Sequence, residues 1–580
     1  MAKPNGLVTY LRNAPLYVVY GIPMVLLLVI NFVLMYTTHS TLLLNADDAS
    51  ELVLAQLLNE EGGILSTNWF YSTEIRVFNS QLFLKIGLAL TQDWRLARCI
   101  GALLMSLFLP AGYIYLVRPL KPARIAYVGA LILLMPFSLE YGTFALFNSF
   151  YASFVILVLF SVGAFLNFAM TTGPRRWWHL GFGCVVSLIA CLPGIRLILS
   201  CYGPMLLVGI FYVWNAWRKD EKRLLTPWHK TVLVGTGALF VAAAVGYLIN
   251  AGILTKVYHV TTYDGTTLYE FSPNTLIFNI LSFFYTFGFS GKVHALGVYG
   301  MAAAAGIVAS CIILWCLATY GKRISTLPQG QQFLWHFFIC TWVLNVVAQT
   351  LLKTDIQCPR YLMPSLIFAL PLVFCMPASW GTKTRTIPLA LVAVLLVATS
   401  TLRYYLPSAL GMTLPKSSEI LEFRLNVVNP STSDLEEVTA YLEDHGVTEG
   451  YATFWHANIL TELSNGDIEV WTLDETTKTD KVYLYTWLQR TEHQTRLPSG
   501  KAFVLVPKIT NIAAAMAPVC NDANMVLENT SYKLYVYDDA ATINEKVISN
   551  VMTSYQEEGD PSYLTTSTST DTSTSTTTAD

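Results

Sequence analysis

The chain has 580 residues, of which 54% are apolar and only 13% charged, with a mean hydropathy of +0.47. Soluble domains carry about 25% charged residues, so this composition excludes an ordinary soluble protein and indicates a chain that largely faces lipid. The formal net charge of −2 argues against a nucleic-acid partner, and the ten cysteines form neither a CxxC pair nor a His/Cys cluster of the kind that holds zinc or haem.

Apolar runs predict about eleven transmembrane helices, because a bilayer core about 30 Å thick requires about 20 apolar residues per helix. The first run is longer than a signal-peptide core of about 7–15 residues, so we expect it to be a retained helix. The predicted spans are 17–36, 97–117, 125–145, 151–170, 180–193, 197–216, 231–252, 296–319, 332–350, 361–379 and 386–405. The predicted fold class is therefore a polytopic α-helical membrane protein.

Basic residues between the spans predict the orientation, because cytoplasmic loops are enriched in Lys and Arg. With eleven spans, all the basic clusters fall on one side of the membrane: Lys3 and Arg12, Arg118 with Lys121 and Arg124, Arg175 with Arg176, the run 218–230, Lys322 with Arg323, and Lys383 with Arg385. We expect this side to be cytoplasmic, which makes the N-terminus cytoplasmic and the C-terminal part extracytoplasmic. The predicted location is a plasma membrane.

Three stretches then lie on the outer side: a long first loop (37–96), a second loop (253–295) and a short third loop (351–360). The stretch 180–216 lies between two basic clusters and must cross twice. Its expected turn is Pro193-Gly194, since proline and glycine interrupt helices. Residues 1–405 form the predicted transmembrane domain.

Mixed polar sequence from residue 406 onward predicts a separate α/β domain over 406–545 on the outer side. We expect a helix over 433–443 and strands near 449–454, 481–485, 502–506 and 531–537. The tail 546–580 is rich in Ser and Thr, lacks the apolar residues to form a core, and is predicted to be disordered.

The first outer loop carries the acidic residues with the clearest chemical potential. Asp47 and Asp48 follow the first span directly, and Glu74 comes later in the same loop. Carboxylates this close to the membrane surface suit a general base or a metal site. The alternative is structural: Asp47 or Asp48 starts a helix over 48–60 as its N-cap.

Two arginines lie where an outward-facing anion site is expected. Arg196 follows the Pro193-Gly194 turn within apolar sequence, and Arg360 with Tyr361 opens the tenth span. A guanidinium fork matches phosphate oxygens, and a charge at membrane depth is a functional candidate. The alternatives are a structural ion pair or snorkelling for Arg196 and an interfacial anchor for Arg360. The other outer cations and imidazoles, His259, Lys292 and His294, are expected to be solvated loop residues.

Together these motifs resemble the GT-C glycosyltransferases, of the protein mannosyltransferase and aminoarabinose transferase type. The resemblance rests on the first-loop acidic pair, the second acidic residue Glu74 and the Arg360-Tyr361 start of a late helix. It implies transfer of a sugar from a polyprenyl-phosphate lipid to an extracytoplasmic acceptor with inversion. Asp48 or Asp47 would be the general base and Glu74 would position the acceptor or support a metal. Arg360, with Arg196 and Tyr361, would hold the donor phosphate.

The segment 450–458 (GYATFWHAN), followed by LSNG at 463–466, resembles the outer domain of uncharacterised bacterial members of this type. Its side chains Trp455, His456 and Asn458, together with Trp487, are predicted to be exposed and able to bind the acceptor. The alternative is a packing domain that orders the outer loops.

The resemblance names a polyprenyl-phosphate sugar and a glycan, lipid or protein acceptor as partners. It names no certain cofactor, although some members use a divalent metal such as Mg²⁺ or Mn²⁺. Other classes stay open: an exporter or flippase of lipid-linked sugar, a non-catalytic surface-assembly or binding protein, and a glycan polymerase or ligase. The chain shows no pseudo-symmetric halves, which argues against the exporter.

Overall fold

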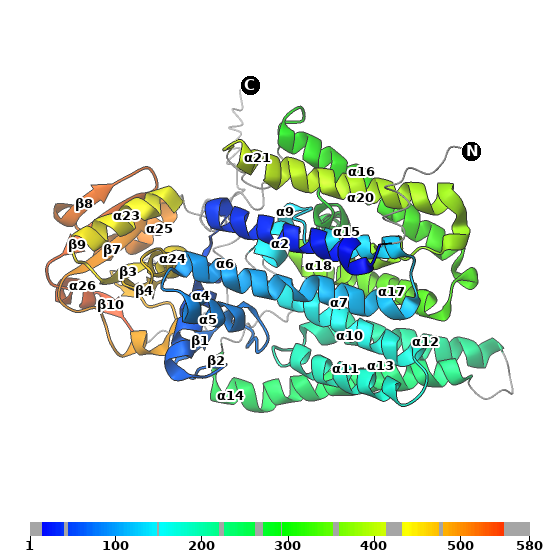
Figure 1. Cartoon of the computed structure of the whole chain (residues 1–580). Coiled ribbons are helices and arrows are strands. Elements are labelled where there is room, and N and C mark those ends of the chain that lie inside the picture. Colours follow the sequence, from blue (N-terminus) through cyan, green and yellow to red (C-terminus); the bar gives the residue numbers. More distant parts are fainter. Residues whose placement is uncertain are drawn as a thin grey trace, which may run out of the picture.

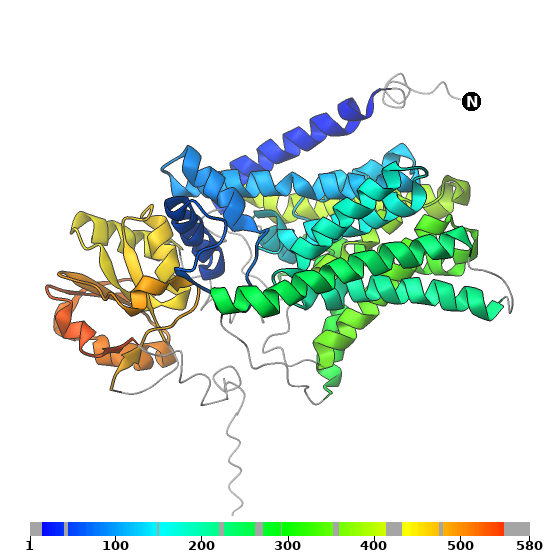
Figure 2. The ribbon, with the colours of Figure 1, turned by 90° about the horizontal axis from the view of Figure 1, so that it is seen from below.

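The computed structural model describes residues 14–39, 44–147, 150–219, 226–260, 271–291, 293–351, 359–412, 432–474 and 480–549. Long helices lie side by side in one bundle, and a sheet-bearing C-terminal region packs against one end of it (Figure 1; Figure 2). The predicted tail beyond residue 549 lies outside the described residues.

Eight helical segments of the described chain are long and apolar enough to cross a membrane, and each overlaps one predicted span. They are Tyr17–Thr37 (η1 Tyr17–Gly21, α2 Ile22–Leu34, η2 Met35–His39), Trp94–Leu120 (α6 Trp94–Ser106, α7 Phe108–Val117, η3 Arg118–Leu120), Ala152–Met170 (α10), Ile198–Arg218 (η6 Ile198–Tyr202, α12 Gly203–Lys219), Pro227–Val257 (α13 Pro227–Ile249, η7 Asn250–Leu254, α14 Thr255–Val257), Val298–Lys322 (α16), Gln329–Leu351 (α17) and Lys383–Ala409 (η11 Thr382–Thr386, α20 Ile387–Ser400, η12 Thr401–Tyr405, α21 Leu406–Ala409).

The remaining three predicted spans coincide with shorter or interrupted helices. Span 180–193 falls on α11 (Arg175–Cys191), and 361–379 falls on η9 (Pro359–Tyr361), α18 (Met363–Leu366) and α19 (Ala369–Phe374). Span 125–145 breaks at 133–138, around Pro136, into η4 (Arg124–Tyr127), α8 (Val128–Ile132), α9 (Leu139–Tyr141) and η5 (Gly142–Phe147). The count of eleven therefore stays a prediction, and a polytopic helical bundle is what the structure supports.

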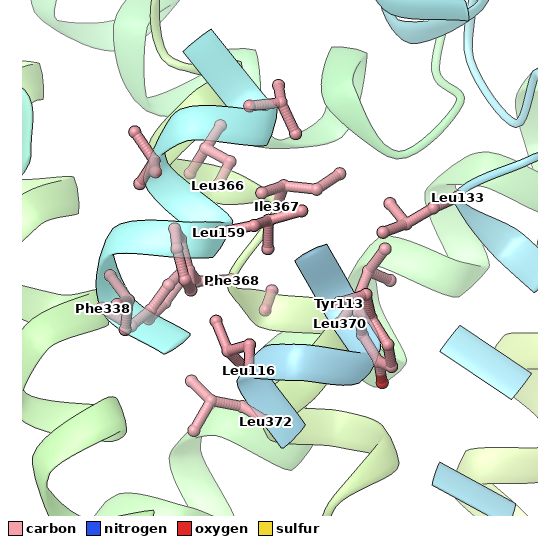
Figure 3. Close-up of a cluster of buried hydrophobic side chains, with 14 of the residues drawn as sticks. Tyr113, Leu116, Leu133, Leu159, Phe338, Leu366, Ile367, Phe368, Leu370 and Leu372 are labelled. Atoms are coloured by element: carbon pink, nitrogen blue, oxygen red, sulfur yellow. The ribbon is translucent and has the colours of Figure 1, made fainter. Parts of the chain in front are cut away.

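Interrupted helices are tolerated here because they lie inside the bundle, where other protein groups satisfy the freed backbone. α18, α19 and the loop between them contribute Leu366, Ile367, Phe368, Leu370 and Leu372 to a buried apolar cluster with α7, α10 and α17 (Figure 3). In contrast, α2 exposes apolar side chains along its length, as expected of a helix that faces lipid.

The predicted turn at 193–194 is present. α11 ends at Cys191, and Gly194 has φ +144°, a backbone conformation that L side chains rarely adopt. The chain then reverses into η6 and α12. The long helices run lengthwise between the sheet-bearing end of the bundle and its opposite end (Figure 1).

The first outer loop folds against the other end of the bundle. It contains α4 (Ala46–Glu61), β1 (Trp69–Tyr71) and α5 (Ser80–Leu90), and α5 packs closely on α6. A Cβ on Gly87 would lie 2.2 Å from the Ala97 carbonyl oxygen, so this approach requires glycine. The second loop contributes β2 (His259–Val260) and α15 (Pro273–Thr286).

The C-terminal region is an α/β fold around a five-stranded sheet of order β4-β3-β7-β9-β8. Strands β4 (Glu469–Leu473), β3 (Glu449–Thr453) and β7 (Ala502–Pro507) are parallel, and β9 (Tyr532–Tyr537) and β8 (Met525–Glu528) extend the sheet in antiparallel fashion. The predicted helix 433–443 is confirmed as α23 (Thr432–Asp444), and the predicted strands coincide with β3, β5 (Val482–Tyr483), β7 and β9. Its other elements are α24 (Phe454–Leu463), η13 (Thr491–Gln494), α25 (Thr510–Met516), η14 (Ala517–Val519), η15 (Asp522–Asn524), α26 (Ala541–Asn544) and β10 (Val547–Ile548).

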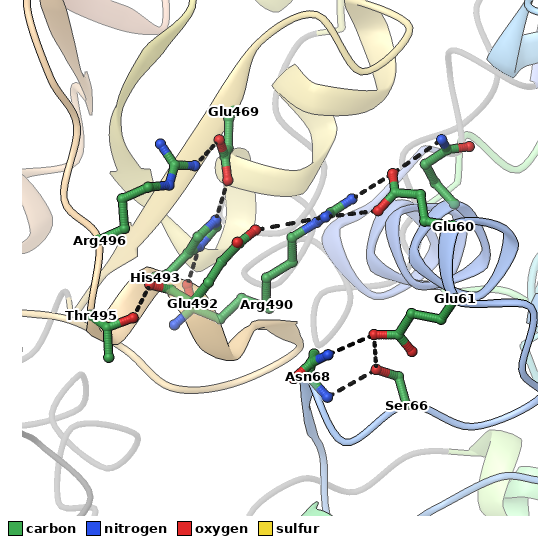
Figure 4. A network of polar contacts seen from close by, with 12 residues as sticks. Glu60, Glu61, Ser66, Asn68, Glu469, Arg490, Glu492, His493, Thr495 and Arg496 are labelled. Carbon is green, nitrogen blue, oxygen red and sulfur yellow. Dashed lines mark hydrogen bonds and ion pairs between the residues drawn. The ribbon is translucent and has the colours of Figure 1, made fainter.

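A small three-stranded sheet joins the C-terminal region to both outer loops. β1 of the first loop pairs with β2 of the second and with β6 (Gln489–Arg490) of the C-terminal region. Arg490 also forms a bidentate ion pair with Glu60 of α4, at 3.0 and 3.1 Å (Figure 4). The C-terminal region is therefore held against the loop that carries the predicted acidic motif.

Candidate active site

Helix α4 orients the first-loop acidic pair. It begins after Asn45, whose side-chain oxygen accepts a hydrogen bond from the backbone N–H of Asp48 at 3.2 Å. Neither aspartate caps the helix, so the capping alternative for Asp47 and Asp48 is wrong. The carboxylate of Asp48 accepts a hydrogen bond from the Asn45 amide and is only 2% exposed, whereas Asp47 is partly exposed.

Two buried charges, Arg98 of α6 and Glu462 of α24, lie beside Asp48. Arg98 of α6 donates through Nη2 to the Asp48 backbone carbonyl at 2.9 Å, and through Nε to Glu462 of α24 at 2.6 Å. A second bond from Nη2 to Glu462 makes this ion pair bidentate. Arg98 is 2% exposed and Glu462 6% exposed, so the pair is withdrawn from water.

Glu51, one turn beyond Asp47 and Asp48, adds another carboxyl to this group. It accepts a hydrogen bond from Ser80 of α5 at 3.2 Å. We call Asp47, Asp48, Glu51, Arg98 and Glu462 the acidic cluster. Burial raises the pKa of Asp48 well above its ordinary value; Arg98 opposes this shift, while Asp47, Glu462 and Glu51 add to it. Burial also raises the pKa of Glu51 and of Glu462.

Glu74 belongs to a second group with the opposite balance of charge. Its two oxygens contact the Nε atoms of Arg76 and Arg196, each at 3.0 Å. Burial alone would raise the pKa of Glu74, but Arg196 and Arg76 outweigh it and hold that pKa below its ordinary value. Glu74 is therefore an ionised counter-ion of two arginines.

Aromatic rings bring Arg360 into the same group. The Arg360 guanidinium lies 4.5 Å from the ring centre of Phe144 and 5.4 Å from that of Tyr151. The ring centre of Tyr361 lies 5.3 Å from the Arg196 guanidinium and 5.8 Å from the Arg360 guanidinium. Glu74, Arg76, Arg196 and Arg360 form what we call the arginine cluster.

Within this cluster Glu74 is the shared counter-ion of Arg76 and Arg196, and Arg360 lies beside aromatic rings of the same group. The Arg196 side chain is 38% exposed as a whole, but its Nη1 atom is buried and has no hydrogen-bond partner among the residues that the structure describes. A phosphate oxygen is a suitable acceptor for such a donor. The structure thus brings together Glu74, Arg196, Arg360 and Tyr361, which the sequence singled out separately. Arg76, next to Glu74 but not predicted, links the two clusters because its charge also acts on Glu51.

The predicted exposure of His456 and Asn458 is wrong. Both lie on the buried face of α24: His456 is 1% exposed and bonds the Thr453 hydroxyl at 2.7 Å, and Asn458 donates to the Leu488 carbonyl at 2.9 Å. Trp455 and Trp487 are partly buried and pack against the first-loop core. These contacts favour the packing alternative for His456 and Asn458.

The predicted loop residues His259 and His294 are exposed, and Lys292 lies outside the described residues. Within the part of the chain that the structure describes, no group of three or more His, Cys, Asp or Glu side chains is arranged to hold a metal ion.

Sequence reasoning missed Glu51, Arg76, Arg98 and Glu462. Arg98 had a usable signal, since it is a charged residue inside the predicted span 97–117. Glu462 had none, because its partner Arg98 lies 364 positions away in the chain.

Comparison with known proteins shows one solved structure with a similar fold. No protein-family profile matches the chain, and no curated protein matches it in sequence. Its fold is similar to that of ArnT from Cupriavidus metallidurans, whose crystal structure is bound to undecaprenyl phosphate. The TM-score is 0.53 and the identity 13%, over 90% of this chain and 98% of that chain. The chain therefore shares the overall fold of that protein, and its apolar helices indicate a polytopic membrane protein.

Proposed function

We propose that the protein is an inverting membrane glycosyltransferase that moves a sugar from a polyprenyl-phosphate donor to an extracytoplasmic acceptor. The observation that carries this proposal is the arginine cluster at the sheet-bearing end of a GT-C-like bundle, which is linked through Arg76 and Glu51 to the group that holds the buried carboxyl of Asp48. The fold alone is compatible with many chemistries, so the function rests on these side chains. The acceptor class is a cell-envelope glycan, lipid or protein.

The arginine cluster is suited to the donor phosphate. During transfer the bond between the anomeric carbon and the phosphate oxygen breaks, and negative charge develops on the phosphate. Arg196 and Arg360 would stabilise that charge, with Tyr361 aligning both guanidinium groups. Glu74 and Arg76 would hold Arg196 in place. A site partly closed by aromatic rings strengthens these interactions because it excludes water.

Asp48 is the better candidate of the acidic pair for the general base. Its buried carboxyl accepts a hydrogen bond from Asn45, whereas Asp47 is partly exposed. A raised pKa makes a carboxylate a stronger base, so ionised Asp48 would take the proton of an acceptor hydroxyl as that oxygen attacks the anomeric carbon. Asp47 is the second candidate.

The membrane arrangement proposed from the basic clusters fits this chemistry. It places the N-terminus in the cytoplasm and both clusters at the outer surface of the plasma membrane. There the phosphate of a lipid-linked donor would lie level with the arginine cluster, and the C-terminal region would face the acceptor.

The test is sugar release by the purified, full-length protein from a panel of radiolabelled polyprenyl-phosphate monosaccharides, with and without Mg²⁺ or Mn²⁺. Wild type is compared with Asp48→Asn and Asp47→Asn, and Glu60→Gln serves as a control on the same helix. We expect turnover with one donor and a loss of about 10²–10⁴-fold in Asp48→Asn. Full activity in both aspartate variants and in their double variant would remove the general-base role. If folded wild type turned over no donor, with acceptor fractions from bacterial envelopes also supplied, the transferase proposal would be wrong.

A further inference from the structure

The contact between α24 and α6 is unusual in its chemistry. Elsewhere the C-terminal region meets the first outer loop through buried apolar side chains, such as Phe454 and Leu488, and through the Arg490–Glu60 pair, whose side chains are 23% and 42% exposed. The Arg98–Glu462 pair is almost fully buried. A buried pair costs desolvation energy that an apolar contact would not, so stability alone explains it poorly.

Arg98 is shared between the C-terminal region and the candidate base. Its guanidinium bonds both oxygens of Glu462 and, through the same Nη2 atom, the backbone carbonyl of Asp48. It does not bond the Asp48 carboxylate, which is held by Asn45 instead. Arg98 therefore forms its ion pair with Glu462, although Asp48 is the other carboxylate within its reach.

Two further contacts fix where Glu462 sits. The backbone N–H of Trp94, at the start of α6, donates to the side chain of Asn465 at 2.9 Å. A Cβ on Gly466, whose φ is +90°, would lie 2.6 Å from the Trp94 indole. The end of α24 is therefore fitted against the start of α6, one turn from Arg98. This is the LSNG segment that the sequence singled out without a role.

We propose that Glu462 is a positioning residue for the transfer reaction, which keeps Arg98 on the backbone carbonyl of Asp48 and away from its carboxylate. We call the Arg98–Glu462 pair the latch. The inference rests on the proposed function for its catalytic meaning. Through the latch, docking of the C-terminal region completes the acidic cluster, so this region controls the base as well as facing the acceptor.

The latch predicts opposite effects for its two members. When Glu462 is neutralised, Arg98 turns to Asp48, the ionised form of Asp48 is favoured, and its pKa falls. When Arg98 is removed, the remaining neighbours of Asp48 are the carboxyls of Asp47, Glu51 and Glu462, so its pKa rises. A pair that merely holds two elements together would leave the titration of Asp48 unchanged in both variants.

The experiment titrates Asp48 directly in the full-length protein. The protonated-carboxyl infrared band that Asp48→Asn abolishes is followed against pH in wild type, Glu462→Gln and Arg98→Met. We expect its midpoint to move to lower pH in Glu462→Gln and to higher pH in Arg98→Met. Glu60→Gln is the matched control. It breaks the exposed ion pair between Glu60 and Arg490, on the same helix as Asp48, and should leave the midpoint in place. Shifts in the same direction, or no shift, would overturn the proposal.

A double variant separates positioning from folding. Arg98→Met/Glu462→Leu replaces the buried pair with apolar side chains and should restore the melting temperature lost in either single variant. Its sugar-transfer kcat should stay at least about 10-fold below wild type, because the bond to the Asp48 carbonyl is gone. Wild-type kcat in this variant would overturn the positioning role. The infrared titration needs no turnover, so it tests the latch even if the proposed transferase activity fails.

Discussion

The two charge clusters at the sheet-bearing end of the bundle are built with opposite balances. The acidic cluster sets four carboxyls against one arginine, and the pKa of Asp48 is raised. In the arginine cluster the carboxyl of Glu74 lies between two arginines, Arg76 and Arg196, and the pKa of Glu74 is lowered. Both carboxyls are buried, so burial does not distinguish them. Their cationic neighbours do, and this assigns proton transfer to Asp48 and charge compensation to Glu74.

The largest effect on activity is expected when a cation is removed from the arginine cluster. Arg196→Met should lower kcat/KM for the lipid donor by about 10²–10³-fold, because a donor to the developing phosphate charge is lost. Steady-state kinetics with the donor found above would measure this. Arg176→Met, at the opposite end of the bundle, is the control and should keep wild-type kinetics. An unchanged kcat/KM in Arg196→Met would remove that residue from the phosphate site.

Neutralising the one carboxyl of the arginine cluster should act on stability first. Glu74→Gln leaves Arg76 and Arg196 without their shared counter-ion, and we expect a loss of roughly 2 kcal/mol in unfolding free energy, below the 3–5 kcal/mol of a fully buried pair because Arg196 is partly exposed. Undecaprenyl phosphate should then raise the melting temperature more in Glu74→Gln than in wild type, since phosphate replaces the missing charge. An equal shift in the two proteins would argue that the phosphate binds elsewhere.

Sequence reasoning reached the parts of this picture that depend on local patterns. Apolar runs located eight spans, and the motif residues Glu74, Arg196 and Arg360 do meet in space. The break inside 125–145 contains Pro136, whereas in 361–379 Pro364 and Pro371 lie within the short helices α18 and α19. Hydropathy cannot distinguish such a buried broken helix from a lipid-facing one.

The missed parts depend on pairing between distant positions. Glu462 looks like an ordinary polar residue of an amphipathic helix until α24 is placed against α6. His456 and Asn458 fail for the same reason, since only the packing of α24 on the sheet shows that they face inward. Period and composition predict the elements, and tertiary contacts decide which side chains are free to react.

The pH dependence of activity should show a smaller effect, which tests the raised pKa of Asp48. Asp48 acts as a base only when ionised, so kcat/KM should fall on acidification through its raised pKa, at higher pH than the ordinary aspartate value of about 3.9. Glu51→Gln removes one like charge and should move this acidic limb to lower pH, by under about 1 pH unit. A limb that moves to higher pH in Glu51→Gln would contradict the assignment of Asp48.

Acidification should change the contributions of Glu74 and Asp48 to folding stability in opposite directions. The folded-state pKa of Glu74 is lowered, so its contribution is present above the unfolded value of about 4.3 and is lost as pH falls through the folded value. The folded-state pKa of Asp48 is raised, so its contribution is present at low pH and is lost as pH rises through the folded value. Thermal melts of wild type, Glu74→Gln and Asp48→Asn across pH should therefore diverge in opposite directions, and parallel curves would contradict the comparison.

The smallest expected effect on activity concerns the other face of α24. His456 is buried against Tyr532, and burial lowers its pKa to about 3, so it stays neutral in the folded protein. Because the unfolded value is about 6.5, folding stability should fall as pH drops below that value, and His456→Gln should reduce this pH dependence. His456→Gln should also leave the KM for the acceptor within about 2-fold of wild type, since α24 presents Glu462 to the acidic cluster but His456 to the sheet core. A KM raised 10-fold or more, with melting temperature unchanged, would return His456 to the acceptor site.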